Sequence, residues 1–162
     1  TGFPKPVLDD MKQLLKNSTM GDKDPRVRQA RGALISHIDW LRVNELRLRI
    51  KAMWDDFFQS YDVLLCPVTF TTAFDHDHNP DLLGRYITVD GKERHYSEIT
   101  TWPSVATISQ LPATVVPIGH SPVGLPIGMQ VIGPYLEDYT TIAFARAIEG
   151  VCSGYTPPPT VK

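Results

Sequence analysis

The sequence lacks the features that mark several broad classes of protein. Its 162 residues contain no stretch of 18 consecutive apolar residues, which excludes a membrane-spanning helix. Charged residues make up 21% and the formal net charge is −2, so we expect no nucleic-acid partner. The two cysteines, Cys66 and Cys152, lie far apart and lack metal-type spacing. They indicate reduced, buried thiols in a cytoplasmic protein.

No serine lies in a Gly-Ser-Ser or G-x-S-x-G setting of the kind that exposes a nucleophile. The serines at positions 18, 36, 60, 97, 104, 109, 121 and 153 are isolated. Ser104, His95 and Glu98 are close in sequence, but a catalytic triad is defined by spatial geometry, and no oxyanion-hole loop accompanies them. We therefore assign no catalytic residue to this chain.

The sequence also lacks a complete set of metal ligands. His76 and His78 flank Asp77, and imidazole and carboxylate groups both bind divalent ions. Nothing else in the sequence completes a four-ligand site, so a mobile loop with solvated histidines is the favoured interpretation. We predict no metal and no cofactor.

The clearest pattern in the sequence is a pair of apolar runs near the C-terminus. Residues Ala113–Ile118 and Ile127–Ile132 are rich in Val and Ile, and a Pro/Gly-rich break from Gly119 to Pro126 separates them. Such runs predict strands. Both alternations within them are apolar, so both faces of the sheet are expected to be covered. Val63–Cys66 predicts a further buried strand that ends at Pro67.

Segments before and after these strands carry apolar residues at helical spacing. Together with the strands they predict an α/β fold. The longest pattern runs from Trp40 to Tyr61 and predicts a packing helix. Asp24 and Pro25 mark the start of a shorter helix, and Ser36 with Asp39 resembles a capping box. Helices are also expected over residues 6–17 and from Asp138 to about Val151. The apolar stripe of the longest helix consists of Val43, Leu46, Ile50, Met53, Trp54 and Phe57, and that of the last helix of Phe144, Ile148 and Val151.

A hairpin is predicted between the Val63–Cys66 strand and the two apolar runs near the C-terminus. Arg85–Tyr96 alternates around Asp90-Gly91, a dipeptide that favours a two-residue turn. Beyond it, Pro103 is suited to the first turn of a helix that leads into Leu111-Pro112.

Several motifs carry a resemblance to a known family. They are Leu111-Pro112-Ala113, Val116-Pro117-Ile118-Gly119, the run from Gly124 to Pro134, the upstream Tyr61–Thr69 and the downstream Glu137–Ile142. Over about residues 24–157 the chain resembles the C-terminal part of the amidase signature family. The resemblance implies the C-terminal part of that family's fold, a mixed central sheet with helices on both faces, formed by residues 1–162.

The family's enzymes hydrolyse or transfer amides through a serine activated by a second serine and a lysine. Both serines belong to a Gly/Ser-rich stretch and the lysine lies farther upstream, and this sequence contains neither element. The chain also has no initiating Met. We therefore expect a segment that starts partway through a longer enzyme, whose catalytic part precedes Thr1.

The resemblance implies that this segment supplies core strands and one wall of a substrate pocket. The candidate lining residues are Thr69, Phe70, Trp102 and Val105. The implied partners are a small-molecule amide and the N-terminal part of the same enzyme, and self-association into a homo-oligomer is a further expectation. One alternative is a component of the amidotransferase for misacylated transfer RNA, from which the hairpin and Trp102 depart. Another is a non-catalytic interaction module.

Overall fold

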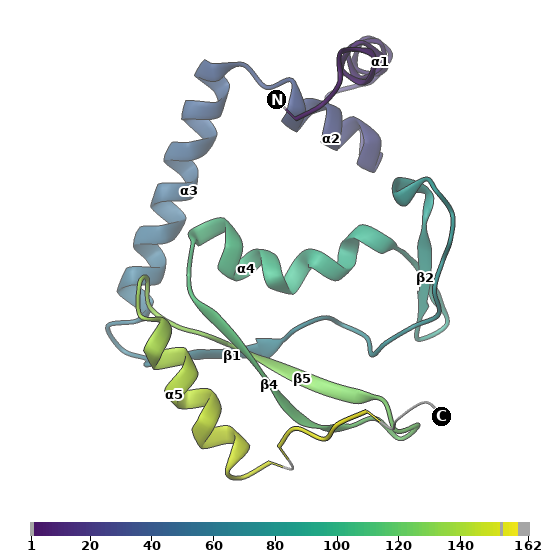
Figure 1. The fold of residues 1–162 in the computed structure, drawn as a ribbon. Coiled ribbons are helices and arrows are strands. Elements are labelled where there is room, and N and C mark those ends of the chain that lie inside the picture. Colours follow the sequence, from purple (N-terminus) through teal and green to yellow (C-terminus); the bar gives the residue numbers. More distant parts are fainter. Residues whose placement is uncertain (1, 153, 159–162) are drawn as a thin grey trace. The chain divides into compact units, whose positions relative to one another are not determined.

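The computed structural model describes residues 2–152 and 154–158 and divides into two compact units, one ending at Leu46 and one beginning at Arg47. In the first unit, helices α1 (Lys5–Lys16) and α2 (Pro25–Ala33) pack side by side (Figure 1). The buried residues of this unit are Met11, Val27 and Ala30. Helix α3 (His37–Phe57) begins in the first unit and ends in the second.

Side chains cap two of these helices as the sequence predicts. The Asp24 carboxylate accepts a hydrogen bond from the Arg26 amide at 2.8 Å, and Pro25 is the first residue of α2. The Ser36 hydroxyl accepts from the Asp39 amide at 3.1 Å and donates to the Asp39 carboxylate at 2.7 Å. That donated hydrogen bond lowers the pKa of Asp39.

The second unit is built on a three-stranded antiparallel sheet. Its strands are β1 (Leu64–Pro67), β4 (Ala113–His120) and β5 (Pro126–Ile132), in the order β1-β5-β4. Ile132 pairs with Leu64 on one side and with Ala113 on the other. The two apolar runs therefore form neighbouring strands, as predicted.

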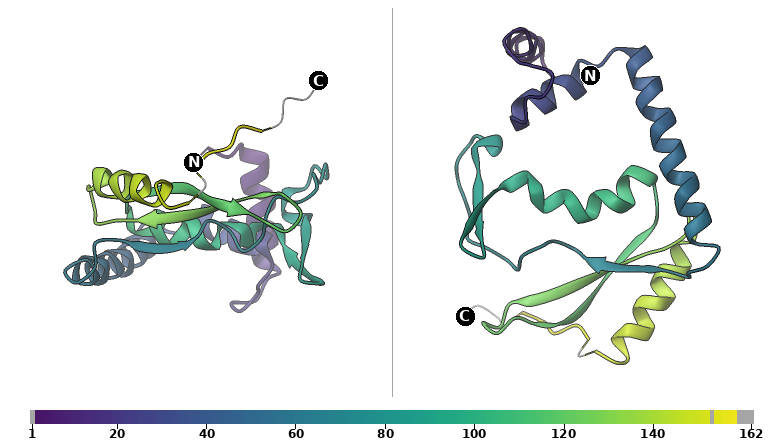
Figure 2. Two further views of the ribbon diagram at one scale, coloured as in Figure 1. Left: turned by 90° about the horizontal axis from the view of Figure 1, so that it is seen from below. Right: turned by 180° about the vertical axis from the view of Figure 1, so that it is seen from behind.

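Helices cover both faces of this sheet, which confirms the predicted α/β arrangement. Helix α4 (Thr101–Ser109) lies over one face and α5 (Asp138–Glu149) over the other (Figures 1 and 2). Side chains alternate between the faces along each strand, so neighbouring residues enter different cores. The α4 side buries Cys66, Ala106, Leu111 and Ile132, and the α5 side buries Val116, Val131, Ala145 and Ile148.

A separate two-stranded hairpin lies between β1 and β4 in the chain. Strands β2 (Tyr86–Val89) and β3 (Lys92–His95) flank Asp90 and Gly91, whose φ angles are 51° and 74°. Two positive φ angles are what a two-residue hairpin turn of this hand requires, so the predicted hairpin is confirmed. The 3₁₀ helix η1 (Leu82–Gly84) precedes it, and η2 (Tyr96–Thr100) leads from it into α4.

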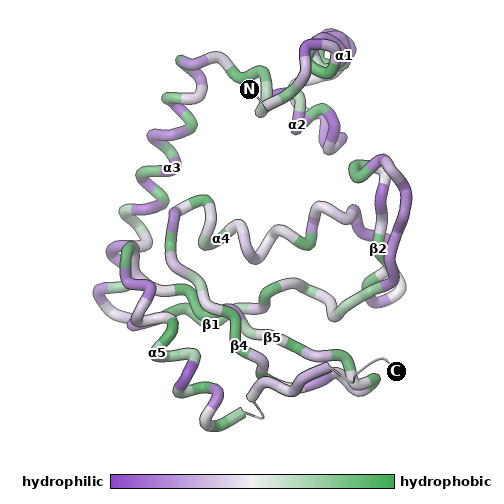
Figure 3. Tube along the Cα trace, viewed as in Figure 1, coloured by the Kyte–Doolittle hydropathy of each residue, from purple (hydrophilic) through white to green (hydrophobic). Residues whose placement is uncertain are grey.

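Helix α3 corrects one expectation. Hydrophobic residues recur along its whole length (Figure 3), but the predicted stripe is largely exposed: Val43 is 54% exposed and Met53 is 70% exposed. Trp54 packs against the α4-side core, and Phe57 is half-buried. The other stripe residues are exposed in the described part of the chain. The periodicity therefore predicted the helix correctly but not the burial of its apolar face.

Three smaller expectations are also wrong. Strand β1 lies at the outside of the three-stranded sheet, and Leu65 is 43% exposed, so only part of this strand is buried. Asp138, a residue type that favours the N-cap and was expected there, is instead the first residue of α5. Glu137 occupies the N-cap position and makes no side-chain capping hydrogen bond. Val151 follows the end of α5 and is 84% exposed, so it does not belong to the buried stripe.

No helix among the described residues has both the length and the apolar character needed to cross a bilayer.

Candidate functional site

The segment that follows β1 forms one wall of a cavity of about 520 Å³. The chain leaves the sheet at Pro67, whose partner in β5 is Met129, and then runs irregularly to η1. The opposite wall comes from one residue of β4 and the start of β5. The lining consists of Val68–Phe74, Val115 and Pro126–Gly128.

The lining of this cavity contains no charged side chain. Phe70, Phe74, Val115 and Ile127 contribute apolar surface, and three threonines contribute hydroxyl groups. The Thr69 hydroxyl oxygen is buried and has no hydrogen-bond partner among the described residues. Leaving a buried hydroxyl unpaired is unfavourable, so a hydrogen bond to this oxygen would be stabilising. The cavity is suited to an uncharged, mainly apolar group that carries a hydrogen-bonding function.

Gly128 makes room for the packing beside the cavity. A Cβ atom at this position would lie 3.0 Å from Cγ1 of Val115 and 3.5 Å from Cγ2 of Val68. The first distance is shorter than an ordinary carbon–carbon contact, so a larger residue would displace Val115. Glycine therefore allows β4 and the segment after β1 to approach the start of β5.

A second cavity of about 500 Å³ adjoins the same segment. It includes His76, Asp77 and His78, and the two imidazole rings are 6.0 Å apart. Arg85 and Tyr96 also line it. Within the described residues, no group of three or more His, Cys, Asp and Glu side chains is arranged to bind a metal ion.

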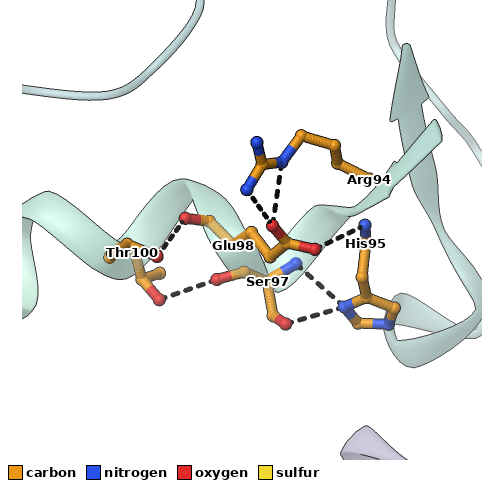
Figure 4. Close-up of polar contacts among 6 residues, drawn as sticks. Arg94, His95, Ser97, Glu98 and Thr100 are labelled. Atoms are coloured by element: carbon orange, nitrogen blue, oxygen red, sulfur yellow. Dashed lines mark hydrogen bonds and ion pairs between the residues drawn. The ribbon is translucent and has the colours of Figure 1, made fainter. Parts of the chain in front are cut away.

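A polar network lies where β3 joins η2 (Figure 4). Nε and Nη2 of Arg94 both donate to one Glu98 carboxylate oxygen, at 2.8 and 2.6 Å, and the other oxygen accepts from the His95 amide at 3.2 Å. The hydrogen bonds from Arg94 are the main cause of the lowered pKa of Glu98. The His95 ring accepts from the Ser97 amide at 3.1 Å and thereby caps η2.

This network does not form a catalytic triad. The Ser104 hydroxyl donates to the Thr100 carbonyl at 2.6 Å, and no contact joins it to His95. Nε2 of His95 lies 2.8 Å from the Leu83 carbonyl oxygen, while Glu98 interacts with the His95 backbone rather than its ring. The sequence proximity of Ser104, His95 and Glu98 therefore has no counterpart in side-chain geometry.

The structure separates the four predicted pocket residues into two pairs. Thr69 and Phe70 line the 520 Å³ cavity together. Trp102 and Val105, by contrast, pack against the core on the α4 side of the sheet. The Trp102 carbonyl also accepts a hydrogen bond from the Gln130 side chain at 3.4 Å. In this chain, therefore, the first pair contributes to a cavity and the second pair to the core.

Sequence reasoning missed several lining residues, namely Phe74, Val115, Ile127 and Gly128. Phe74 lies in an irregular segment with no periodicity. Val115 and Ile127 belong to strands that sequence reasoning treated as buried throughout, although Val115 is 53% exposed. A clue was available, since Val115 alternates with the buried Val116 and must face the opposite side of the sheet.

Comparison with protein families gives a match over most of the chain. The family model named Amidase matches residues 6–142. A glutamyl-tRNA(Gln) amidotransferase subunit from Acaryochloris marina is 34% identical over 110 residues, which are 68% of this chain and 21% of that protein. The chain thus spans about a fifth of the length of the curated relatives that it matches.

Solved structures show the same fold. One described as an amidase has a TM-score of 0.63 at 21% identity, covering 90% of this chain and 32% of that one. The corresponding glutamyl-tRNA(Gln) amidotransferase subunit from Thermotoga maritima has a TM-score of 0.53 at 26% identity, covering 85% of this chain and 29% of that one. In both cases the described residues correspond to about a third of a larger molecule.

Proposed function

Because the chain belongs to the amidase family, we propose that it is the C-terminal part of an enzyme that hydrolyses carboxamide bonds. The enzyme's serine attacks the amide, forms an acyl-enzyme and releases the amine, and water then hydrolyses the ester. The family's two serines and lysine lie outside this chain. No catalytic residue is assigned here, and no metal or cofactor is required by the proposed reaction.

The role of this chain is to supply core strands and a wall of the substrate pocket. The observation that carries this proposal is the uncharged cavity beside β4 and β5, which Thr69 and Phe70 line. A neutral amide substrate can place its apolar part against Phe70 while Thr69 offers a hydroxyl for a hydrogen bond. Trp102 and Val105 act indirectly, because they fix the α4 side of the sheet that carries these strands.

The partners of this chain follow from the same proposal. They are a small-molecule amide and the N-terminal part of the enzyme, with self-association as a further property of the isolated chain. Both described cysteines are free thiols, and Cys66 is buried, which supports a cytoplasmic location.

The test uses the full-length enzyme, assayed for ammonia release from benzamide and acetamide. Replacing Phe70 by Ala is expected to raise KM for benzamide by about tenfold with little change in kcat, because it removes apolar contact made equally to substrate and transition state. Val123→Ala is the control, since Val123 is 80% exposed and does not line the cavity. An unchanged KM in the Phe70 variant would show that this cavity does not bind the substrate. The absence of hydrolysis in the wild-type enzyme would contradict the amidase assignment.

A second candidate function is that of a component of the complex that amidates misacylated transfer RNA. The 34% identity to an amidotransferase component favours it. Such a protein would release ammonia from glutamine in the presence of its partner proteins and charged transfer RNA. Glutamine turnover that depends on those partners, without benzamide hydrolysis, would support this function instead.

A further inference from the structure

Two phenylalanines of the cavity are each held by a residue from outside it. The guanidinium carbon of Arg94 lies 4.6 Å from the ring centre of Phe70. The ring of Tyr96 meets that of Phe74 edge to face, with the centres 6.0 Å apart and the planes at 81°. Arg94 belongs to β3 and Tyr96 begins η2, so the contacts come from adjoining parts of one segment. Neither residue lines the cavity itself.

Arg94 is fixed in the orientation that this contact requires. Two of its nitrogens donate to one oxygen of Glu98, and the other oxygen accepts from the His95 amide. The side chains of Arg94 and Glu98 are 47% and 39% exposed, so their ion pair contributes little stability by itself. Its effect is geometric, because a long side chain that would sample many rotamers is held with its guanidinium over Phe70.

The backbone beneath Arg94 and Tyr96 is also fixed. The Leu83 carbonyl can only accept, so Nε2 of His95 carries the proton of that 2.8 Å contact. Nδ1 is then free to accept from the Ser97 amide and hydroxyl, at 3.1 and 2.7 Å. His95 thus ties the end of β3 both to the chain at Leu83 and to the first turn of η2. Arg94 and Tyr96, which flank His95 in the chain, therefore make their aromatic contacts from a backbone that these hydrogen bonds hold in place.

We propose that Arg94 and Tyr96 are positioning residues that hold Phe70 and Phe74 and thereby make the cavity selective for an uncharged aromatic group of the substrate. This inference rests on the proposed function and assigns a role to the hairpin. The amide's aromatic group lies against Phe70 on the cavity side, and the guanidinium of Arg94 contacts the same ring from outside. Loss of Arg94 leaves the lining residues present but frees the Phe70 ring.

The test places 4-fluorophenylalanine at position 70 of the full-length enzyme and follows its fluorine NMR signal during titration with benzamide or acetamide. In the wild-type background, benzamide should shift the signal saturably, and acetamide should have a much weaker effect. Arg94→Met should move the signal of the unliganded enzyme and weaken benzamide binding by at most about two- to fivefold, because the free energy of the one cation–π contact that holds Phe70 limits the effect. Arg94→Lys keeps the charge and should give an intermediate result.

Lys92→Met is the matched control, because Lys92 lies on the same strand but neither lines the cavity nor contacts Phe70. It should leave both the signal and the affinity unchanged. A wild-type-like signal and affinity in Arg94→Met, or an equal change in Lys92→Met, would overturn the positioning role. In turnover, Arg94→Met should raise KM for benzamide by a larger factor than KM for acetamide.

The same measurements separate this inference from the proposed function. If benzamide binds at Phe70 but no ammonia is released, the hydrolytic assignment fails and the positioning role stands. If acetamide is hydrolysed but benzamide does not perturb the Phe70 signal, the hydrolytic assignment stands and the selectivity proposal is wrong.

Discussion

Val131 shows how strongly one position of this sheet is constrained. It is completely buried on the α5 side, and Val116 is 4% exposed in the same core. An isolated carboxylate at either site would cost several kcal/mol, a large part of the roughly 5–15 kcal/mol that stabilises a typical domain. We expect Val131→Asp and Val116→Asp to prevent soluble folding.

The measurement is soluble yield followed by thermal unfolding. Val123→Asp serves as the control, because Val123 is 80% exposed and its substitution adds the same charge. Wild-type-like melting of either core variant would mean that the strands are not buried as described.

Glu98 makes the braced hairpin sensitive to acid. Arg94 and the His95 amide favour the charged carboxylate, so the pKa of Glu98 is lower in the folded protein than in the unfolded chain. The unfolded chain therefore binds more protons between these two values, and the stabilising effect is complete above the ordinary glutamate pKa of about 4.3. It is lost as the pH falls through the lowered value.

We therefore expect the fluorine signal of a probe at position 70 to change as the pH falls below about 4.3 and Glu98 becomes protonated. Glu98→Gln should abolish that acid-dependent change. An identical change in the Gln variant would show that another group is responsible.

Helix α3 separates what periodicity can predict from what it cannot. The local pattern identified this helix, the capping residues Asp24 and Ser36 and the turn at Asp90-Gly91, because each depends on interactions within a few residues. Burial depends on what packs against an element. The exposed stripe of α3 and the exposed Leu65 of β1 are therefore errors of context rather than of local structure.

The candidate site shows the same division. Thr69 and Phe70 were candidates because the family resemblance implies that the loop after this strand lies near the substrate, and they line one cavity. Ile127 could not be joined to them from the sequence, since the antiparallel pairing of β1 with β5 brings the start of β5 beside the segment that follows Pro67. Phe74 lies in that irregular segment, where no periodic pattern predicts the direction of a side chain. The family resemblance placed Trp102 near the substrate pocket. In the structure its side chain packs against the core between α4 and the sheet.

Exposure of α3 predicts association of the isolated chain. Apolar residues distributed along this helix, including Val43, Leu46 and Met53, are more than half exposed. Contiguous apolar surface and open strand edges both favour self-association or binding to the N-terminal part of the enzyme that we propose. We expect the purified chain to be oligomeric at low micromolar concentration by light scattering, or to co-purify with an N-terminal fragment identified by intact mass.

Replacing Val43 and Met53 together by Lys should reduce the scattering. Glu45→Lys adds charge of the same sign on the same helix without removing apolar surface and should reduce it less. A stable wild-type monomer with no co-purifying fragment would favour the alternative of a self-sufficient interaction module.

The 110 residues that match the Acaryochloris marina relative are 68% of this chain and about a fifth of that protein. The sheet order β1-β5-β4 leaves one open side on β1 and one on β4 within the described residues. A longer sheet can continue at either side. We propose that the residues around the cavity beside β4 form one wall of a site whose reactive groups belong to another part of the enzyme.

This division of labour predicts that the isolated chain is chemically inert toward reagents for serine hydrolases. A nucleophilic serine needs an oriented base and oxyanion-hole donors. The Ser104 hydroxyl donates to the Thr100 carbonyl, and the Ser97 hydroxyl donates to a His95 ring whose other nitrogen contacts the Leu83 carbonyl rather than a carboxylate. We expect no fluorophosphonate adduct on the chain and no hydrolysis of benzamide or acetamide by it. The full-length enzyme, treated in parallel, should gain one adduct on a serine outside these 162 residues. A stoichiometric adduct on any serine of the isolated chain, located by peptide mass spectrometry, would show that it carries a nucleophile of its own.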